Sequence, residues 1–229
     1  MKKNVLGVKI DDVSIPEIVN IVEGWLKKPG KYYIVTPNPE IVMMAQKDAE
    51  LKRIINQADL AIPDGRGLKL TGDIVNNSPG IDVMERLIKE LSEKGAAAGF
   101  LGGKGDVAEK TAECLKRKYP KLQVSFATSG GEVNEDGKLL RSLKLLKADL
   151  LFVAFGPPKQ EKWIAKNLPE LPIKVAMGVG GAFDYISGKV PRAPQWIRDL
   201  GMEWLFRLII QPWRIRRQLS LIKYLLMLR

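Results

Sequence analysis

The chain has 229 residues and is 45% apolar, which suits one large α/β domain or one domain with an appendage. Its single cysteine, Cys114, excludes an internal disulfide and favours a reducing compartment. The chain contains no histidine, which is the commonest general base and metal ligand. Acid–base chemistry must therefore fall to Asp, Glu, Lys or Tyr.

The net charge of +11 is concentrated towards the end of the chain. Residues 205–229 hold six cations and no acid, so the remainder carries a net charge of +5. This asymmetry favours a local surface for phospholipid or phosphate over a nucleic-acid-binding protein. No stretch reaches the ~18 consecutive apolar residues of a transmembrane helix. No apolar run follows Met1–Lys3 either, so we expect no signal peptide.

In chain order, the first expected elements are a small hairpin around 5–10, a strand over 32–36 and one long helix over 40–57. A strand over 60–63 and a helix over 82–94 follow. The remaining pattern predicts strands over 96–101, 123–127, 150–155 and 174–177, and helices over 107–118, 137–146 and 159–167. This alternation indicates an α/β fold with a Rossmann-like, mostly parallel sheet flanked by helices.

The compact α/β pattern ends near residues 191–194, which predicts a core over 1–194 and a C-terminal appendage over 195–229. Within the appendage, Ile215, Leu219, Ile222 and Leu226 form an apolar stripe at helical spacing. The cations Arg214 and Arg217 lie off that stripe. A basic amphipathic helix of this kind is typical of a membrane interface. The alternative is a helix that packs its stripe on a partner subunit.

Polar and glycine-rich clusters follow the expected strands at 36–38, 64, 102–105, 156–160 and 178–184. Ligands of open α/β sheets bind at the carboxyl ends of the strands, so these clusters predict one pocket. From them, from the corner at 192–194 and from the appendage we take candidate substrate-binding residues: Gly102, Gly103, Lys104, Gly156, Pro158, Lys159, Gln160, Gly180, Gly181, Asp184, Arg192, Arg207, Arg214 and Arg217.

Two of these clusters have the form of phosphate-binding loops. Residues 102–105 (GGKG) join a strand to a helix and can present backbone N–H groups to a phosphate, although a tight turn explains them equally well. They form neither G-x-G-x-x-G nor a Walker A loop. Lys159 and Gln160 begin a helix after a proline-rich turn, which also suits a phosphate. The structural alternative leaves Lys159 solvated.

Three residues are candidates for catalysis. Asp64 follows a strand and precedes a glycine, so it can project into the pocket as a base, although spacing alone favours an Asp that caps a turn or a helix start. Thr36 and Asn38 lie in a proline-stiffened loop and can orient a sugar or diphosphate, unless Asn38 only satisfies its own turn. The chain has no D-x-D motif and no Cys/His set for a metal. We expect no metal and no cofactor, and a leaving diphosphate would need Arg, Lys and backbone donors.

Taken together, these motifs resemble the WecG/TagA/CpsF family of bacterial glycosyltransferases, and its TagA-like members most closely. The matching segments are TPNPE at 36–40, PDG at 63–65, FLGGK at 100–104, GPPKQEKW at 156–163, RAP at 192–194 and EWLFR at 203–207. Their joint order, which spans nearly the whole chain, is more specific than any one of them.

The resemblance implies metal-independent, inverting transfer of N-acetylmannosamine from a UDP donor to the 4-hydroxyl of GlcNAc-diphospho-undecaprenol, in wall teichoic acid linkage-unit synthesis. It implies Asp64 as the base and Thr36, Asn38 and Gln160 in the same pocket. C-terminal arginines would complete the site over the diphosphate. The implied partners are the UDP-sugar, the lipid acceptor and the anionic inner leaflet of the membrane, with no nucleic acid. The enzyme would be peripheral on the cytoplasmic face, with a homo-oligomer left open.

The chain departs from the family pattern in two places. Relatives carry Arg-Val/Ile-x-Gly-x-Asp before the helix at Asp82, where this chain has NNSPGID at 76–82 and lacks the Arg. A His-Gly-Tyr-like motif is replaced by TSGG at 128–131. A related transferase of ManNAcA or glucose therefore stays an alternative. A Rossmann-like oxidoreductase is a further one, although the dinucleotide fingerprint that it requires is absent.

Overall fold

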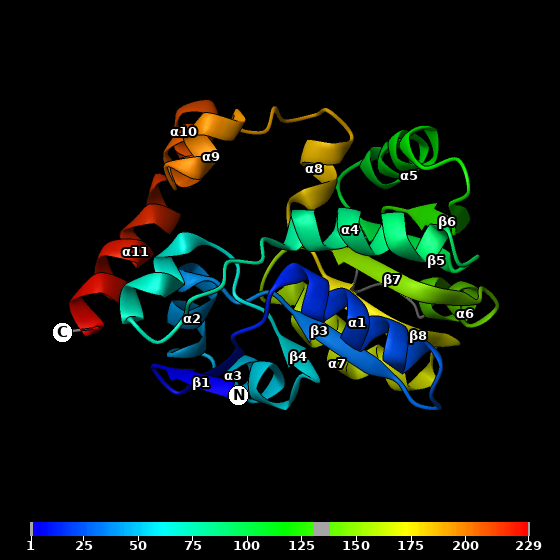
Figure 1. Ribbon diagram of the computed structural model, residues 1–229, viewed down its shortest axis with the longest axis horizontal. Coiled ribbons are helices and arrows are strands. Elements are labelled where there is room, and N and C mark those ends of the chain that lie inside the picture. The colour runs from blue at the N-terminus through cyan, green and yellow to red at the C-terminus, as the bar shows by residue number, and fades with distance from the viewer. Residues whose placement is uncertain (1, 131–137, 229) are drawn as a thin grey trace.

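The computed structural model describes residues 2–130 and 138–228, with the side chains of 138, 214 and 216–219 outside this description. A six-stranded parallel sheet forms its centre, in the order β4-β3-β8-β7-β5-β6 (Figure 1). The strands are β3 (Tyr32–Val35), β4 (Leu60–Ala61), β5 (Ala97–Gly102), β6 (Gln123–Thr128), β7 (Ala148–Ala154) and β8 (Ile173–Gly178). The expected α/β fold is therefore confirmed.

Helices cover both faces of the sheet because side chains alternate along each strand. Phe100 and Phe152 pack against α1 (Ile15–Leu26), α4 (Gly80–Ser92) and α5 (Val107–Lys118). The next residues along the same strands, Leu101 and Val153, pack on the other face against α6 (Lys138–Lys144) and α7 (Lys159–Asn167). The first residue of the helix expected over 137–146 lies outside the described residues.

Several helices were not predicted or were predicted with other bounds, and two of these cases have a clear physical reason. The long helix expected over 40–57 is two helices, α2 (Pro39–Ala45) and α3 (Ala49–Gln57), because Asp48 accepts a hydrogen bond from Leu51 N at 2.9 Å and starts a new helix. Helix α1 was not expected at all. Its sequence signal is a capping box, in which the Glu17 carboxylate accepts from the backbone N–H of Ser14.

A third cluster of buried residues joins the N-terminal hairpin, β1 (Lys2–Val5) and β2 (Val8–Asp11), to α2 and α3. The hairpin is antiparallel, as expected. The C-terminal helix α11 (Ile215–Met227) lies beside α2 and contributes a fully buried Tyr224 to this cluster (Figure 1). The end of the chain is therefore packed on the core through this residue.

Between the sheet and α11, the chain passes through α8 (Ala182–Ile186), α9 (Gln195–Asp199) and α10 (Glu203–Ile210). Short 3-10 helices complete the described part: η1 (Arg66–Thr71), η2 (Leu168–Glu170) and η3 (Pro212–Arg214). No helix among residues 2–130 and 138–228 is long and apolar enough to cross a membrane.

Candidate active site

The expected polar clusters lie along one edge of the sheet. They follow β4, β3, β8, β7 and β5, which are neighbours in this order, and parallel strands end at the same edge. In the sheet, β4 lies outside β3 on one side and β6 lies outside β5 on the other, so the chain winds outward in opposite directions from these two strands. In open α/β sheets, such a reversal marks the place where a ligand crevice is expected between the loops.

Thr36 and Asn38 make different use of their side chains. Thr36 is 4% exposed, and its hydroxyl donates to the carbonyl of Gly178 at 3.2 Å, which ties the end of β3 to the end of β8. The side-chain oxygen of Asn38 accepts from Ile41 N at 2.9 Å and caps α2. Asn38 thus has the helix-capping role that was the structural alternative for it.

Asp64 lies just beyond β4, on a short connection held by backbone hydrogen bonds. Its own N–H donates to the carbonyl of Pro37 at 3.0 Å. Burial of the carboxyl group, and then the negative charge of Glu203, raise its pKa to about 7. A hydrogen bond from the backbone of Gly80 and the positive charge of Arg207 act in the opposite direction. The carboxyl is thus poised between its acid and base forms near neutral pH.

Gln160 holds the loops after β7 and β8 together. It is 1% exposed, and its side-chain oxygen accepts from Gly156 N at 3.1 Å and Gly180 N at 3.0 Å. Its amide nitrogen donates to Glu161, whose pKa is raised by burial despite that hydrogen bond. A side chain at Gly178 would meet this amide at 2.9 Å. Gln160 therefore supports the loops after β7 and β8 from the protein interior. Lys159 of the same helix, in contrast, is exposed.

The GGKG loop has the geometry of a tight turn. Gly102 has a φ of +112°, and a Cβ there would lie 2.7 Å from the Ala154 carbonyl carbon, so a side chain has no room. The N–H of Gly103 donates to the same carbonyl group at 3.2 Å. This donor is therefore engaged within the protein, and Lys104 is exposed.

Arg192 and Arg207 come from the C-terminal third of the chain and contact elements at the same edge of the sheet. Arg192 makes a two-pronged ion pair with Asp82, at 2.7 and 2.8 Å, at the start of α4. The Arg207 guanidinium lies 4.8 Å from the centre of the Tyr185 ring, and a Cβ at Gly181 would collide with it. Its Nε is buried without a hydrogen-bond partner in the described part of the chain. Arg207 is thus a cation over the loop after β8.

The other candidates are placed less directly. Asp184 is half-buried in the first turn of α8, next to the same loop. The side chains of Arg214 and Arg217 lie outside the described residues. Sequence reasoning missed two neighbours of Asp64. These are Glu203, whose charge raises its pKa, and Asn77, whose side chain accepts from Gly65 N at 2.9 Å. The difference from the family pattern at residues 76–82 was the sequence feature that could have pointed to Asn77.

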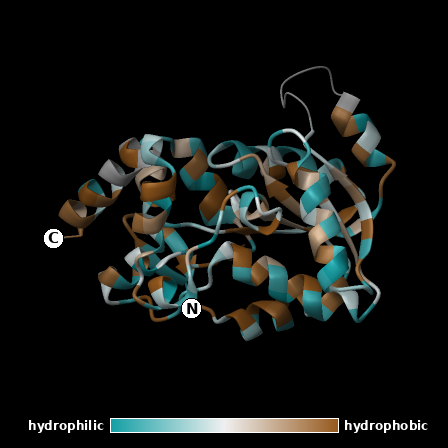
Figure 2. Ribbon diagram, turned by 90° about the horizontal axis from the view of Figure 1, so that it is seen from above, coloured by the Kyte–Doolittle hydropathy of each residue, from teal (hydrophilic) through white to brown (hydrophobic). Residues whose placement is uncertain are grey.

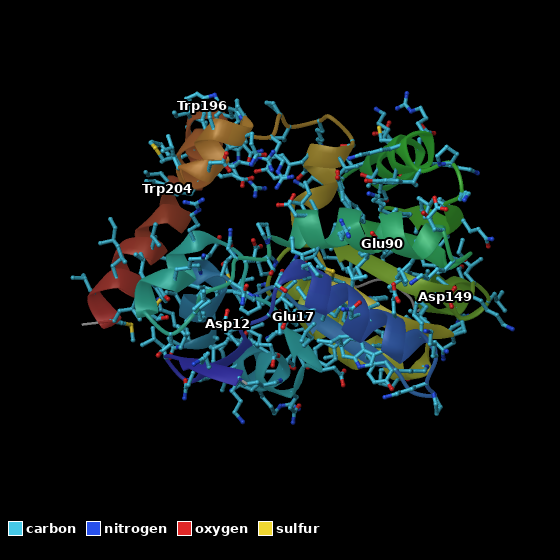
Figure 3. The ribbon with its side chains drawn as sticks, viewed as in Figure 1. Asp12, Glu17, Glu90, Asp149, Trp196 and Trp204 are labelled. Carbon is cyan, nitrogen blue, oxygen red and sulfur yellow. The ribbon has the colours of Figure 1, made fainter. Side chains whose placement is uncertain are left out.

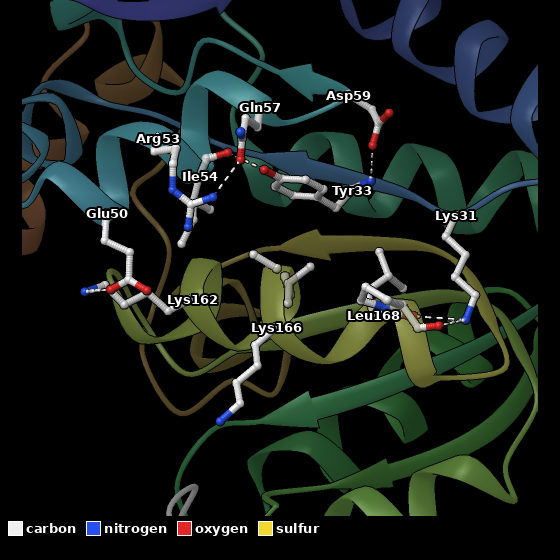
Figure 4. A pocket seen from close by; sticks show the side chains of 13 residues that line it. Lys31, Tyr33, Glu50, Arg53, Ile54, Gln57, Asp59, Lys162, Lys166 and Leu168 are labelled. Atoms are coloured by element: carbon white, nitrogen blue, oxygen red, sulfur yellow. Dashed lines mark hydrogen bonds and ion pairs between the residues drawn. The ribbon is translucent and has the colours of Figure 1, made fainter.

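A second hollow lies between α3 and α7, away from this edge (Figure 4). Several of its polar groups have partners within the protein. Lys162 bridges Asp48 and Glu50 at 2.8 and 2.7 Å, and the Tyr33 hydroxyl donates to the carbonyl of Ile54. These pairings join α3 to α7 and β3, so the carboxyl edge is the better candidate for chemistry.

Comparison with known proteins agrees with the motifs. The model of the Glycosyl transferase WecG/TagA/CpsF family matches residues 3–229. A Bacillus subtilis (strain 168) protein is 34% identical over 93% of this chain and 88% of its own length. A Staphylococcus aureus (strain MRSA252) protein is 32% identical over 96% of this chain and 89% of its own length. Both are named N-acetylglucosaminyldiphosphoundecaprenol N-acetyl-beta-D-mannosaminyltransferase.

Proposed function

Because this chain belongs to the WecG/TagA/CpsF family of glycosyl transferases, we propose that it moves N-acetylmannosamine from UDP-ManNAc to the 4-hydroxyl of GlcNAc-diphospho-undecaprenol. This reaction builds the linkage unit of wall teichoic acid. The names of the relatives support the acceptor and the transferred sugar. The observation that carries the proposal is the position of the Asp64 carboxyl group, just beyond β4 at the carboxyl edge of the parallel sheet, where burial raises its pKa to about 7.

In this proposal Asp64 is the general base. Its carboxylate takes the proton of the acceptor 4-hydroxyl while that oxygen forms a bond to the anomeric carbon of the donor sugar. The bond from this carbon to the diphosphate oxygen breaks, its electron pair leaves with UDP, and the configuration inverts. A base with a pKa close to the working pH combines an adequate deprotonated fraction with useful basicity.

The leaving diphosphate gains negative charge as that bond breaks, and we assign its stabilisation chiefly to Arg207. The guanidinium lies over Gly181, and its buried Nε is a donor for which the described part of the chain offers no acceptor. Fixed positive charge aimed at developing negative charge is usually a large catalytic contribution. Arg214 and Arg217 are further candidates. Gly180 would line the donor side, and the buried Thr36 and Gln160 would support it from the protein interior.

Membrane docking is the proposed role of the appendage over 195–229. Helix α11 turns Tyr224 and Leu221 towards the core, whereas Ile222 and Leu226 of the expected apolar stripe face solvent, 57% and 63% exposed. Figure 2 shows hydrophobic residues along α11 at the end of the molecule, and Figure 3 shows Trp196 and Trp204 on the outside of α9 and α10. Exposed tryptophans and cations together suit the surface of an anionic leaflet. A partner subunit is the competing occupant.

A transfer assay tests the reaction. The full chain is incubated with a GlcNAc-diphosphate-lipid acceptor and UDP-ManNAc, UDP-ManNAcA or UDP-glucose in separate reactions. We expect a disaccharide-lipid product with UDP-ManNAc at a rate well above that with the other donors. A faster reaction with UDP-ManNAcA or UDP-glucose would replace the proposed donor, and no product with any of them would overturn the transferase assignment to this acceptor.

Membrane binding is expected to depend on exposed apolar side chains of the appendage that do not pack in the core. Ile209, Trp213 and Ile222 are exposed, so their combined replacement by Ser removes apolar contact area without opening the core. We expect at least about tenfold weaker co-sedimentation with anionic vesicles, because each large apolar side chain that enters the interface contributes roughly 1 kcal/mol or more. The matched control is Val75→Ser with Leu145→Ser, two exposed apolar residues outside the appendage. Unchanged vesicle binding, with a smaller assembly in size-exclusion chromatography, would favour the partner subunit.

A further inference from the structure

We propose that Asn77 is a positioning residue for Asp64, and that Asp12 holds the Asn77 segment in place. The proposal rests on the role of Asp64 as the base and extends it to the residues that aim its carboxylate. Neither Asn77 nor Asp12 belongs to a motif that pointed to catalysis, so the argument comes from the hydrogen bonds around the Asp64 connection.

The connection that carries Asp64 is held largely from one neighbouring segment. The carbonyl of Pro63 accepts from Ser78 N at 2.8 Å, and Gly65 N donates to the side-chain oxygen of Asn77 at 2.9 Å. Gly65 has a φ of +98°, and a Cβ built there meets nothing within 4 Å. Packing at this point is therefore loose, and hydrogen bonds rather than steric contacts determine the path of the backbone next to Asp64.

The same segment also reaches the reacting group. Three residues after Asn77, Gly80 begins α4, and its backbone interacts with the Asp64 carboxyl and lowers the pKa of that group. Gly80 is in turn packed against Thr36, since a Cβ there would lie 3.2 Å from the Thr36 methyl carbon. Residues 77–80 thus hold the backbone next to Asp64 at one point and its carboxyl group at another, which sets the direction of the side chain.

Asp12 fixes this segment to the rest of the fold. Its carboxylate accepts from Val75 N at 3.2 Å, from Asn76 N at 2.8 Å and from the Asn76 side chain at 3.1 Å (Asp12 is labelled in Figure 3). Partial burial raises its pKa, but these hydrogen bonds outweigh that effect and hold the pKa below its ordinary value. The Asp12 carboxylate therefore stays ionised at working pH and anchors residues 75–76, from which Asn77 extends.

The test compares Asn77→Ala with Asn56→Ala, a matched control. Asn56 also uses its side chain to hold a loop, accepting from Lys9 N at 2.8 Å and donating to the carbonyl of Gly7 at 3.0 Å, but it lies in α3, remote from Asp64. Both variants are expected to lower the Tm. Asn77→Ala should in addition lower kcat by about tenfold to a hundredfold, since small displacements of a catalytic group cost rate on this scale, with the KM for the UDP-sugar within twofold of wild type.

A variant that restores activity distinguishes a role of Asn77 in positioning Asp64 from a role in protein stability alone. Asn77→Asp keeps a side-chain oxygen for Gly65 N and should recover most of kcat at alkaline pH, while its added charge moves the rise of kcat to higher pH. Asp12→Asn should lower kcat less than Asn77→Ala. A kcat for Asn77→Ala within twofold of that for Asn56→Ala, or Asn77→Asp as impaired as Asn77→Ala at every pH, would overturn the proposal. Inactive wild-type protein would instead overturn the proposed reaction.

Discussion

Replacing Asp64 with Asn is expected to lower kcat for sugar transfer by ~100-fold or more while leaving the fold intact. The amide keeps the shape of the carboxylate but cannot take a proton from the acceptor hydroxyl. Transfer is measured with saturating donor and acceptor, and the fold is checked by circular dichroism. The control is Asp73→Asn, which makes the same charge change at an exposed position in the following loop. Near-normal turnover of the Asp64 variant would remove this residue from the mechanism.

The raised pKa of Asp64 makes two further results part of the same prediction. Wild-type kcat should rise as pH increases through about 7, because the base form is the active one. The folded state binds this proton more tightly than the unfolded state, whose pKa is near 3.8, so the stability contribution of the protonated group is lost as pH rises towards 7. The Asp64→Asn variant has no proton to lose at this position, so its stability does not fall in this way as the pH rises. Its Tm should exceed that of wild type at pH 8 and match it near pH 4.

Replacing Arg207 with Gln is expected to lower kcat by about 100-fold or more, as for the loss of a principal donor to a developing negative charge. The rise of kcat with pH should also move to higher pH, because the Arg207 charge helps to keep the pKa of Asp64 from rising further. The two effects together would place one guanidinium close to both the leaving group and the base.

The control for Arg207 is Tyr185→Phe, which preserves the aromatic ring over which the guanidinium lies but removes the hydroxyl. This variant should retain most of the activity. Binding of UDP, measured by calorimetry, separates ground-state from transition-state effects. If Arg207→Gln binds UDP weakly but transfers at the normal rate when saturated, Arg207 serves substrate binding rather than the chemical step.

The α/β fold was predictable because its signals are local. Apolar runs of strand length alternate with helical periodicity, and the sheet rules bring their polar ends to one edge without knowledge of side-chain contacts. Two of the errors, the missing α1 and the break at Asp48, are also local. Both helix starts depend on a capping side chain, which a search for apolar periodicity alone does not detect.

The appendage shows a limit of periodicity. The expected stripe on α11 is apolar in the sequence, but the fold buries the other side of the helix through Tyr224 and leaves Ile222 and Leu226 in solvent. Both sides carry large apolar residues, so the hydrophobic pattern alone could not select the inward face. In the structure, Tyr224 packs in one cluster with residues of α2 and the hairpin.

By itself, the sequence determined the class of fold, the edge of the sheet at which the polar clusters gather, and the candidate residues there, because periodicity and residue chemistry are local properties. Tertiary structure decided how these residues are used. Asn38 caps a helix, Arg192 pairs with Asp82 from 110 positions away, and Asp64 acquires a pKa of about 7 from burial and from charges distant in the chain. Burial and charge act through space, so such roles emerge only when distant segments are brought together.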